Sequence, residues 1–371
     1  MSEPSHAGAI LTIDLGAIAA NYRLLREMVP GAECACVVKA DAYGLGMDRV
    51  APALAAAGCR TFFVAQTGEG IALRNRLPEA TIHVLNGLAG ADPRDFTDHN
   101  LVPVLNNLAE IEAWARFCRE RGTAFATDIH ADTAMSRLGL TGQDVALLAA
   151  EPGLAKGISV SHVMSHLACA EEQDNPLNGR QLAAFGGALA ALPPALSGKA
   201  SLANSSAIFL GSDYHFDMVR AGAALYGIAP VAGQPNPMAQ VVSLQGKILQ
   251  VREIDTPQTV GYGATHRAAR KEKIATVAVG YADGYLRSLS NSGGGYIGGI
   301  RAPVVGRVSM DLTTLDVSSV PDDQARPGAL VELIGPHNPI DQVAADAGTI
   351  AYEILTSLGS RYHRVYTGGG G

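Results

Sequence analysis

Short apolar segments alternate with longer amphipathic segments from residue 34 to about residue 225. Eight apolar segments have the length of buried strands: CACVVKA, TFFVAQ, TIHVLNG, LVPVL, AFATDIHAD, GISVSHVMSH, SLANSS and DMVRAG. The stretches between them, such as 47–58, 108–121 and 181–192, carry apolar residues at helical spacing. Strand–helix alternation is typical of a parallel sheet, and eight such units predict a closed (β/α)8 TIM-like barrel.

The pattern changes after about residue 235. The segments QVVSLQGKILQVREID, KIATVAVGYAD and RAPVVGRVSMDLTTLDV alternate or are rich in β-branched residues, with Gly and Pro turns between them. They predict a smaller, mostly-β domain. We assign 12–234 to the barrel and 1–11 with 235–371 to the β domain, although the AILTIDL segment near the N-terminus could pair with either part. The glycine-rich stretch 293–299 is interpreted as a loop.

Composition narrows the class of protein. The 371 residues suit about two domains, and a hydrophobic content of 47% is ample for a large core. A net charge of -7 without any Lys/Arg cluster argues against nucleic-acid binding. Five cysteines without a CxxC pair indicate reduced thiols. No signal peptide and no apolar run of 18 residues is found, so we expect a cytoplasmic protein that does not enter a membrane.

The ends of the predicted barrel strands carry the candidate chemistry, because the reactive groups of (β/α)8 enzymes lie at the carboxyl ends of the strands. These ends are rich in cations, amides and hydroxyls, which suits a ligand with a phosphate and a carboxylate. The residues are Lys39, Asn86, 132–137, His166, Asn204, Ser205, Arg220 and Gly222.

Lys39 is the strongest single candidate. It is one of six lysines, and it alone ends a buried-looking strand and precedes a turn, in CACVVKADAYGLG. A partly desolvated amine has a lowered pKa and can form a Schiff base. The alternative is an ordinary lysine whose stem is buried and whose charge reaches solvent. Tyr43 follows closely and taken alone is a rim aromatic, while Gly44 and Gly46 let the backbone pass close to a ligand.

The last two barrel strands offer donors for a phosphate. Ser205 supplies a hydroxyl, and Gly222 in VRAGAALYG supplies a backbone N–H at the position where this fold usually binds phosphate. Arg220 lies within an apolar stretch, where its guanidinium needs an acceptor. A pyridine nitrogen and a neighbouring carboxylate are both candidates.

A metal site is not expected. His162 and His166 are four residues apart, but the Glu of HExxH is missing and the run looks like a strand. His166, nearer the strand end, is the better candidate for an active site. No dinucleotide fingerprint, P-loop or nucleophile elbow is found.

Taken together, these motifs resemble the alanine racemase family along nearly the whole chain. VVKADAYGLG is similar to the family's cofactor-lysine signature, and DTAMSRLG, SHLACAEE, NSSA, VRAGAALYG, VGYGATHRA, VGYADGY, GRVSMD and AYEIL occur in family order. The resemblance implies an isomerase that carries pyridoxal 5'-phosphate as a Schiff base on Lys39. It implies further cofactor contacts from Tyr43, His166, Ser205, Arg220, Gly222 and Tyr352. Substrate contacts would come from Arg137, Met310, Tyr281 and Asp311.

The resemblance also implies a reaction. L-alanine and D-alanine interconvert by proton transfer at the α-carbon, with Lys39 and Tyr262 as two bases on opposite faces. Nearby cations would favour the phenolate of Tyr262, and we expect His166 and Arg220 to supply them. In the family this tyrosine reaches the cofactor of the other subunit, which implies a homodimer with shared sites. The product would supply D-alanine for peptidoglycan, or the enzyme would serve alanine catabolism.

Departures from the family pattern affect the substrate side. Many members carry a carbamylated lysine that holds the carboxylate-binding arginine, whereas this chain has His130 there. We therefore expect a bound anion such as chloride near His130 and Arg137, or a less fixed Arg137. Ala134 replaces a common glycine, and Ser309 replaces a common cysteine.

Three alternatives remain from the sequence. A broader racemase acting on serine is the nearest, since apolar pockets reject one hydroxyl weakly. A fold-related amino-acid decarboxylase would want an acidic partner for the pyridine nitrogen, where this chain has Arg220. A non-catalytic cofactor-carrier barrel would lack the β domain.

Overall fold

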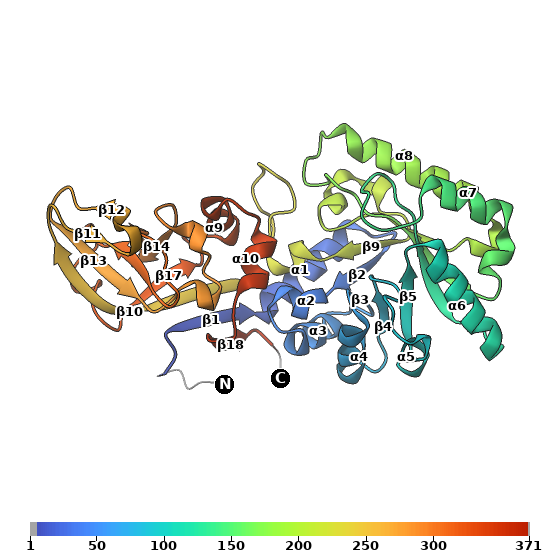
Figure 1. Cartoon of the computed structure of the whole chain (residues 1–371), viewed down its shortest axis with the longest axis horizontal. Coiled ribbons are helices and arrows are strands. Elements are labelled where there is room, and N and C mark those ends of the chain that lie inside the picture. Colours follow the sequence, from blue (N-terminus) through green and yellow to red (C-terminus); the bar gives the residue numbers. More distant parts are fainter. Residues whose placement is uncertain (1–5, 370–371) are drawn as a thin grey trace.

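Eight parallel strands form a closed barrel, on the right of Figure 1, in the computed structural model, which describes residues 6–369. The strands are β2 (Glu33–Val37), β3 (Thr61–Val64), β4 (Thr81–Val84), β5 (Leu101–Leu105), β6 (Ala126–His130), β7 (Ser159–Met164), β8 (Lys199–Ser201) and β9 (Met218–Ala221). Their order is β8-β7-β6-β5-β4-β3-β2-β9. A bridge between Asn204 and Arg220 joins β8 to β9 and closes the ring. The predicted barrel is therefore confirmed.

Helices cover the outside of the barrel because each has one apolar face. They are α1 (Leu15–Met28), α3 (Met47–Ala56), α4 (Thr67–Arg76), α5 (Pro93–Asp98), α6 (Leu108–Arg121), α7 (Gly142–Ala150) and α8 (Pro176–Ala191). In α6, Ile111, Trp114 and Cys118 are buried at helical spacing. The Asn107 side chain accepts a hydrogen bond from the Glu110 N–H at 2.9 Å and so caps the first turn of α6. The helix expected over 108–121 is confirmed.

The second part of the chain is a mostly-β unit on the left of Figure 1. Its main sheet has the order β15-β14-β17-β10-β1-β18, and β13 pairs with β10 and β16. The strands are β1 (Ala9–Asp14), β10 (Val242–Ile254), β11 (Thr259–Val260), β12 (His266–Arg267), β13 (Glu272–Val277), β14 (Gly294–Ile297), β15 (Ile300–Pro303), β16 (Thr313–Asp316), β17 (Leu330–Ile334) and β18 (His363–Thr367). The AILTIDL segment belongs here, because β1 pairs with β10 and β18.

Short helical segments complete both parts. Two α-helices, α9 (Ile340–Ala347) and α10 (Ala351–Ser357), follow β17, and α10 lies beside the barrel in Figure 1. The 3-10 turns are η1 (Pro152–Ala155), η2 (Pro194–Leu196), η3 (Ser206–Leu210), η4 (Ser212–Tyr214), η5 (Ala223–Tyr226), η6 (Tyr262–Ala264), η7 (Tyr281–Asp283) and η8 (Arg287–Leu289). None of the helices within 6–369 is long and apolar enough to cross a membrane. All five cysteines are free thiols, as expected.

The glycine-rich stretch 293–299 is not the loop that we expected. Residues 294–297 form β14, which pairs with β15 and β17. A Cβ atom at Gly295 would lie 2.6 Å from Val331 Cγ1, so only glycine lets the two strands pack this closely. The prediction from glycine content was wrong because these glycines serve close packing rather than turning.

A left-handed turn follows the first barrel strand. In α2 (Lys39–Tyr43), four consecutive non-glycine residues, 40–43, have φ between 52° and 56°. Such backbone costs about 1–2 kcal/mol per residue, so surrounding contacts must hold it. Arg364 donates to the Gly44 carbonyl at 2.7 Å, and Tyr366 Oη donates to the Leu45 carbonyl at 2.9 Å. The turn is thus held in place by β18, at the opposite end of the chain.

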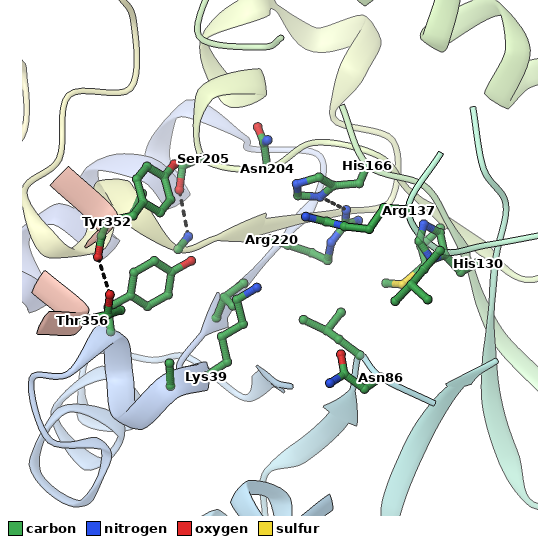
Figure 2. Close-up of a pocket in the computed structure, with 18 of the residues that line it drawn as sticks. Lys39, Asn86, His130, Arg137, His166, Asn204, Ser205, Arg220, Tyr352 and Thr356 are labelled. Atoms are coloured by element: carbon green, nitrogen blue, oxygen red, sulfur yellow. Dashed lines mark hydrogen bonds between the residues drawn. The ribbon is translucent and has the colours of Figure 1, made fainter. Parts of the chain in front are cut away.

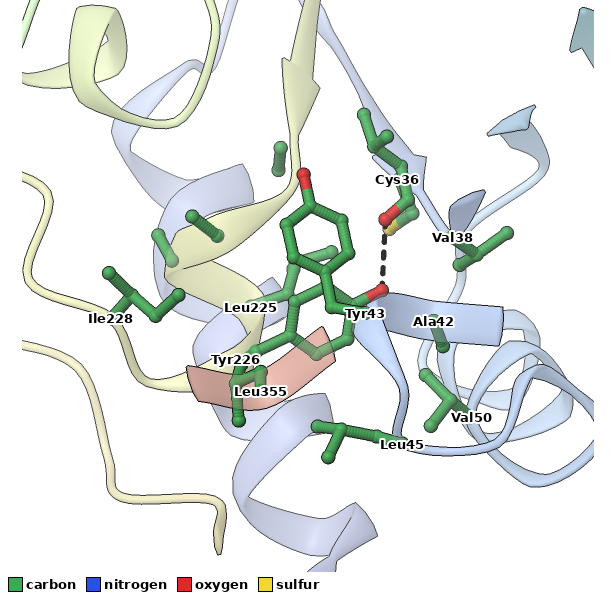
Figure 3. Packing of buried hydrophobic residues seen from close by; sticks show 14 of the residues in the cluster. Cys36, Val38, Ala42, Tyr43, Leu45, Val50, Leu225, Tyr226, Ile228 and Leu355 are labelled. Atoms are coloured by element: carbon green, nitrogen blue, oxygen red, sulfur yellow. Dashed lines mark hydrogen bonds between the residues drawn. The ribbon is translucent and has the colours of Figure 1, made fainter. Parts of the chain in front are cut away.

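The turn directs Tyr43 into the core. Its ring packs against that of Tyr226 (Figure 3), and the two ring centroids are 4.7 Å apart. Tyr226 in turn donates a hydrogen bond to the Val37 carbonyl at 2.9 Å. These two rings connect the segment after β2, which carries Lys39, to the segment after β9, which carries Gly222.

Candidate active site

A cavity of about 580 Å³ opens at the carboxyl ends of the barrel strands. Figure 2 shows its polar side chains converging from different strands. Eight residues predicted as site residues line it: Lys39, Tyr43, Arg137, His166, Ser205, Arg220, Gly222 and Tyr352. Asn86, His130 and Asn204 also line it, so most of the strand-end residues identified in the sequence meet in one place.

Lys39 lies in a cationic and largely buried environment. Burial lowers the pKa of its amine, and the nearby charges of Arg137 and Arg220 lower it further. Glu69 opposes them. One Glu69 carboxylate oxygen accepts from the Ala40 N–H at 2.6 Å, which places this charge at the start of the left-handed turn. A lysine with a lowered pKa is a better nucleophile and a better base at neutral pH.

One end of the cavity offers hydroxyl and amide donors. Ser205 Oγ accepts hydrogen bonds from the N–H groups of Gly222 at 2.8 Å and Ala224 at 3.2 Å. Its own proton is therefore left to be donated. A Cβ atom at Gly222 would lie 2.7 Å from Tyr43 Oη, so glycine keeps this end open. Tyr352, from α10, lies with its ring centroid 5.9 Å from that of Tyr43.

Arg220 forms the buried floor of the opposite end. Its Nη1 donates to the carbonyl and hydroxyl oxygens of Ser201 at 3.0 and 2.6 Å, and its Nη2 donates to the Ser165 carbonyl at 2.5 Å. Its Nε has no hydrogen-bond partner among residues 6–369. Burial lowers the pKa of Arg220 to about 10, which leaves it charged at neutral pH. The carboxylate partner considered as an alternative in the sequence is not in hydrogen-bonding contact.

The histidines of the cavity are neutral. Burial lowers the pKa of His166 well below its ordinary value, and Arg220 lowers it further. The expectation that His166 supplies positive charge is therefore wrong, because an imidazolium beside a buried guanidinium is disfavoured. Burial likewise lowers the pKa of His130 to about 4. The Nδ1 of His130 lies 2.8 Å from Asn106 Oδ1, and Asn106 Nδ2 donates to the Leu85 and Val104 carbonyls.

Arg137 lies on a strained loop after β6. Ala134 and Ser136 have φ of 88° and 56°, which non-glycine residues rarely adopt. The Asp132 carboxylate accepts from the N–H groups of Met135 at 2.9 Å and Ser136 at 3.1 Å and so helps to hold the loop. The Arg137 side chain is exposed on one side and lines the cavity on the other.

The remaining four predicted residues do not line the cavity. Tyr262, Tyr281 and Met310 are 72%, 42% and 54% exposed. Asp311 pairs with Arg361 at 2.7 Å. Tyr281 and Met310 belong to adjacent loops, since the Tyr281 N–H donates to the Ser309 carbonyl at 3.0 Å. All four lie on the surface of the β unit.

Sequence reasoning missed part of the cavity wall. Glu353 and Thr356 reach it from α10, and Leu138 and Met164 reach it from the barrel. The AYEIL motif was the one sequence signal for α10, and it pointed to Tyr352 alone. A second omission is a buried cluster of His83, Asp128 and His162, the one group of potential metal ligands within 6–369. His162 therefore belongs with His83 and Asp128 rather than with His166.

Known proteins are similar to this chain over nearly its whole length. Residues 13–230 match the family "Alanine racemase, N-terminal domain", and residues 241–366 match "Alanine racemase, C-terminal domain". An alanine racemase from Rhodospirillum rubrum is 52% identical and covers 99% of this chain and 98% of its own length. A catabolic alanine racemase from Mesorhizobium japonicum is 48% identical, with coverage of 98% and 94%.

Solved structures of alanine racemases are also similar to this chain. An alanine racemase from Bartonella henselae, with covalently bound pyridoxal phosphate, has a TM-score of 0.93 at 44% identity. It covers 97% of this chain and 99% of its own. The biosynthetic alanine racemase from Pseudomonas aeruginosa has a TM-score of 0.89 at 33% identity, with coverage of 97% and 99%.

Proposed function

Because the chain belongs to the alanine racemase family, we propose that it interconverts L-alanine and D-alanine with pyridoxal 5'-phosphate as its cofactor. The resemblance noted in the sequence is confirmed. The observation that carries the proposal is the cavity itself, where Lys39 lies with Arg137 and Arg220. An amine able to form a Schiff base, surrounded by cations, fits a cofactor with a phosphate and a substrate with a carboxylate.

The residues of the cavity fit pyridoxal phosphate at both ends. Ser205 Oγ, the Gly222 backbone and the tyrosine hydroxyls would hold the phosphate. Arg220 would face the pyridine nitrogen through Nε, since its Nη atoms are occupied by Ser201 and Ser165. A guanidinium gives up its proton reluctantly, so Arg220 would leave the ring nitrogen of a bound cofactor unprotonated. That would favour proton return to the α-carbon over decarboxylation and so disfavours the alternative of an amino-acid decarboxylase.

The chain's own groups then move the proton. Pyridoxal phosphate, when bound, supplies an electron-accepting ring that stabilises the charge left on the α-carbon after deprotonation. We assign Lys39 to hold the cofactor and to remove or return the α-proton on one face. Arg137 orients the substrate carboxylate. Inversion requires a second acid–base group on the opposite face, and no tyrosine other than Tyr43 and Tyr352 lines the cavity within 6–369.

We assign the second base to Tyr262 of a partner subunit in a homodimer. Within one chain Tyr262 is 72% exposed and outside the cavity. The exposed large hydrophobic residues support an interface, because seven of the ten found belong to the cavity mouth or to the surface loops of the β unit and α10. These seven are Leu138, Tyr262, Tyr281, Met310, Leu312, Ile350 and Tyr352. Tyr281, Met310 and Asp311 would reach the substrate from the same partner.

A bound chloride near Arg137 and His130 is a further proposal. Lys39, Arg137 and Arg220 bring three cationic side chains to the cavity, whereas Glu353 is its one acidic lining residue within 6–369. His130 carries no negative charge to fix Arg137. An anion beside Arg137 would compensate this excess.

The remaining assignments follow from the family. We propose a cytoplasmic enzyme that supplies D-alanine for peptidoglycan or serves alanine catabolism. We propose the division into a barrel of 12–234 and a β domain of 1–11 with 235–371, of which residues 1–5 and 370–371 lie outside the described structure. Strand β1 (Ala9–Asp14) pairs with β10 and β18, so the β unit extends three residues past the first of these boundaries. Serine should be turned over more slowly than alanine, because the aromatic residues at the entrance favour a small side chain.

Conversion of L-alanine to D-alanine by purified protein tests the function directly. Chiral chromatography should show both enantiomers converging on equal amounts. Wild-type protein that holds the cofactor but leaves alanine unchanged would overturn the assignment, and serine would then be assayed. Removal of chloride by dialysis into sulfate buffer should raise the KM for alanine, and an unchanged KM would contradict the chloride proposal.

A further inference from the structure

Three polar side chains are buried inside the barrel below the cavity. The Asp128 carboxylate, on β6, lies 2.6 Å from His83 Nδ1, on β4, and 3.1 Å from His162 Nδ1, on β7. It also accepts from the His162 backbone N–H at 3.1 Å. All three residues are at most 9% exposed, and Asp128 is fully buried. Barrel interiors are usually filled with branched apolar residues, so three polar residues at this position are unusual for the fold.

The three residues lie directly under the cavity. Side chains two residues apart on a strand point to the same face. The residues two positions further along the chain are Leu85, directly after β4, His130 on β6 and Met164 on β7, and all three line the cavity. The polar cluster is therefore one layer below the surface that a ligand contacts.

Hydrogen bonding indicates the charge of the cluster. A carboxylate accepts but does not donate, so both imidazoles donate to Asp128 from Nδ1. His83 Nε2 is buried and has no hydrogen-bond partner among the described residues, so His83 is bonded through Nδ1 alone. The neighbouring imidazoles keep the pKa of Asp128 below its ordinary value despite its burial. The carboxylate is therefore charged.

Arg220 is the one buried Arg or Lys among the described residues, and Asp128 is the one buried carboxylate of the barrel among them. The hydrogen bonds of Arg220 go to backbone carbonyls, the Ser201 hydroxyl and His166, which are all neutral acceptors. A buried guanidinium with neutral partners alone is costly. Burial lowers the pKa of Arg220, and attraction by the Asp128 carboxylate raises it again in part.

We propose that Asp128, fixed by His83 and His162, is the buried counter-charge of Arg220 and a positioning residue of the reaction. The inference rests on the proposed function, since Arg220 matters through the cofactor ring that it would face. It adds that the three residues below the cavity, which would not touch a ligand, set the charge balance around Arg220 at its floor. A transition metal held by the same three residues is the competing explanation, because two imidazoles and a carboxylate form a common metal-binding set.

Asp128→Asn tests the charge, because the two side chains have nearly the same shape. We expect kcat to fall about tenfold, as the loss of one charge pair at intermediate dielectric predicts, with a KM for alanine within about threefold of wild type. The same substitution in an Arg220→Gln background should lower kcat by less than about twofold. Equal effects in the two backgrounds would mean that Asp128 does not act through Arg220, and the proposal would fail.

Thr127→Val is the matched control. Thr127 is buried next to Asp128 on β6, and its hydroxyl donates to the Pro103 carbonyl at 2.8 Å. This variant loses one buried hydrogen bond without losing charge, so it should leave kcat unchanged. If Asp128→Asn does not fold, His162→Asn keeps the carboxylate and removes one ring donor, and we expect a fall in kcat of two- to threefold. An unchanged kcat in that variant would count against the proposal.

Two readouts do not depend on activity. In cofactor-free protein with ¹⁵N-labelled histidine, two strongly hydrogen-bonded ring N–H signals should be present in wild type and lost in Asp128→Asn. Elemental analysis of the same samples should find no bound metal. One equivalent of metal that is present in wild type and absent from Asp128→Asn would overturn the counter-charge assignment. Both measurements test the cluster even if wild type fails to racemise alanine, a result that would instead reject the proposed function.

Discussion

The barrel cavity and the exposed loops of the β unit divide the predicted site residues into two unlike groups. In the barrel, strained backbone and desolvated charges surround Lys39, and most groups are held by hydrogen bonds within the chain. On the β unit, Tyr262 and Met310 are more than half exposed and lie outside the cavity. The barrel group is held by contacts within the chain, whereas Tyr262 and Met310 are exposed and would act only on a partner subunit under the proposed function. Variants in the two regions should therefore fail in different ways.

The largest effect is expected in the barrel, at Lys39. Lys39→Ala should lower the rate of alanine racemisation by about a thousandfold or more, because both cofactor attachment and one proton transfer are lost. Chiral chromatography measures the rate, and the absorbance of the protein-bound cofactor reports its attachment. Lys199→Ala, at an exposed lysine on β8, is the control and should behave as wild type. A Lys39→Ala protein that retains a tenth of the activity would contradict the assignment.

Mixing two inactive variants tests whether the β-unit surface serves a partner. Lys39→Ala and Tyr262→Phe proteins should each be nearly inactive. After subunit exchange, half of the dimers are mixed, and each mixed dimer has one intact site of two. We expect about a quarter of wild-type activity, which would place the two residues in different subunits. A mixture as inactive as its components would mean that both residues act within one chain.

A smaller effect is expected at His130, from the dependence of stability on pH. Its folded pKa of about 4 lies below its ordinary value, so the unfolded chain binds more protons between about pH 4 and 6.5. Stability should therefore rise with pH across this window and be lost as the pH falls. His130→Gln should reduce the rise, although His166 will retain a part of it. Urea unfolding of the cofactor-free protein at several pH values measures this, with His6→Gln as the control. The same rise in wild type and His130→Gln would contradict the prediction.

The smallest effect is expected at Ala134, which has φ of 88° on the loop that carries Arg137. Ala134→Gly should raise the free energy of unfolding by about 1 kcal/mol or less, since relief of strain outweighs the added chain entropy. Thermal unfolding measures this change. Ala149→Gly, inside α7, should instead be destabilised by about 1 kcal/mol. If both variants lose stability alike, the loop around Ala134 is not strained.

The barrel half of the site could be predicted from sequence because topology alone brings its residues together. The carboxyl ends of parallel strands converge in any closed barrel, so Lys39, His166 and Arg220 needed no knowledge of distant contacts. The resemblance to a family then supplied Tyr262 and Met310, which no local pattern connects to the barrel. Their place in a dimer stays a prediction.

The features that sequence analysis missed depend on strand register and on contacts between distant parts of the chain. Glu353 and Thr356 reach the cavity because α10 docks beside Gly44, about 300 positions away in the chain. His83 and Asp128 lie within segments whose sequences predict apolar strands. The two side chains meet because of the register between the barrel strands, which the sequence does not show. The stretch 293–299 was misread because glycine marks close packing as well as turns.

The left-handed turn after Lys39 has a consequence for shortened variants of the protein. The carbonyls of Gly44 and Leu45, directly after the turn, accept hydrogen bonds from Arg364 and Tyr366, which lie 320 and 321 positions further along the chain. A variant cut before β18 would lose both hydrogen bonds while keeping every barrel residue of the site. We expect it to hold Lys39 less firmly and to bind the cofactor more weakly than the full chain.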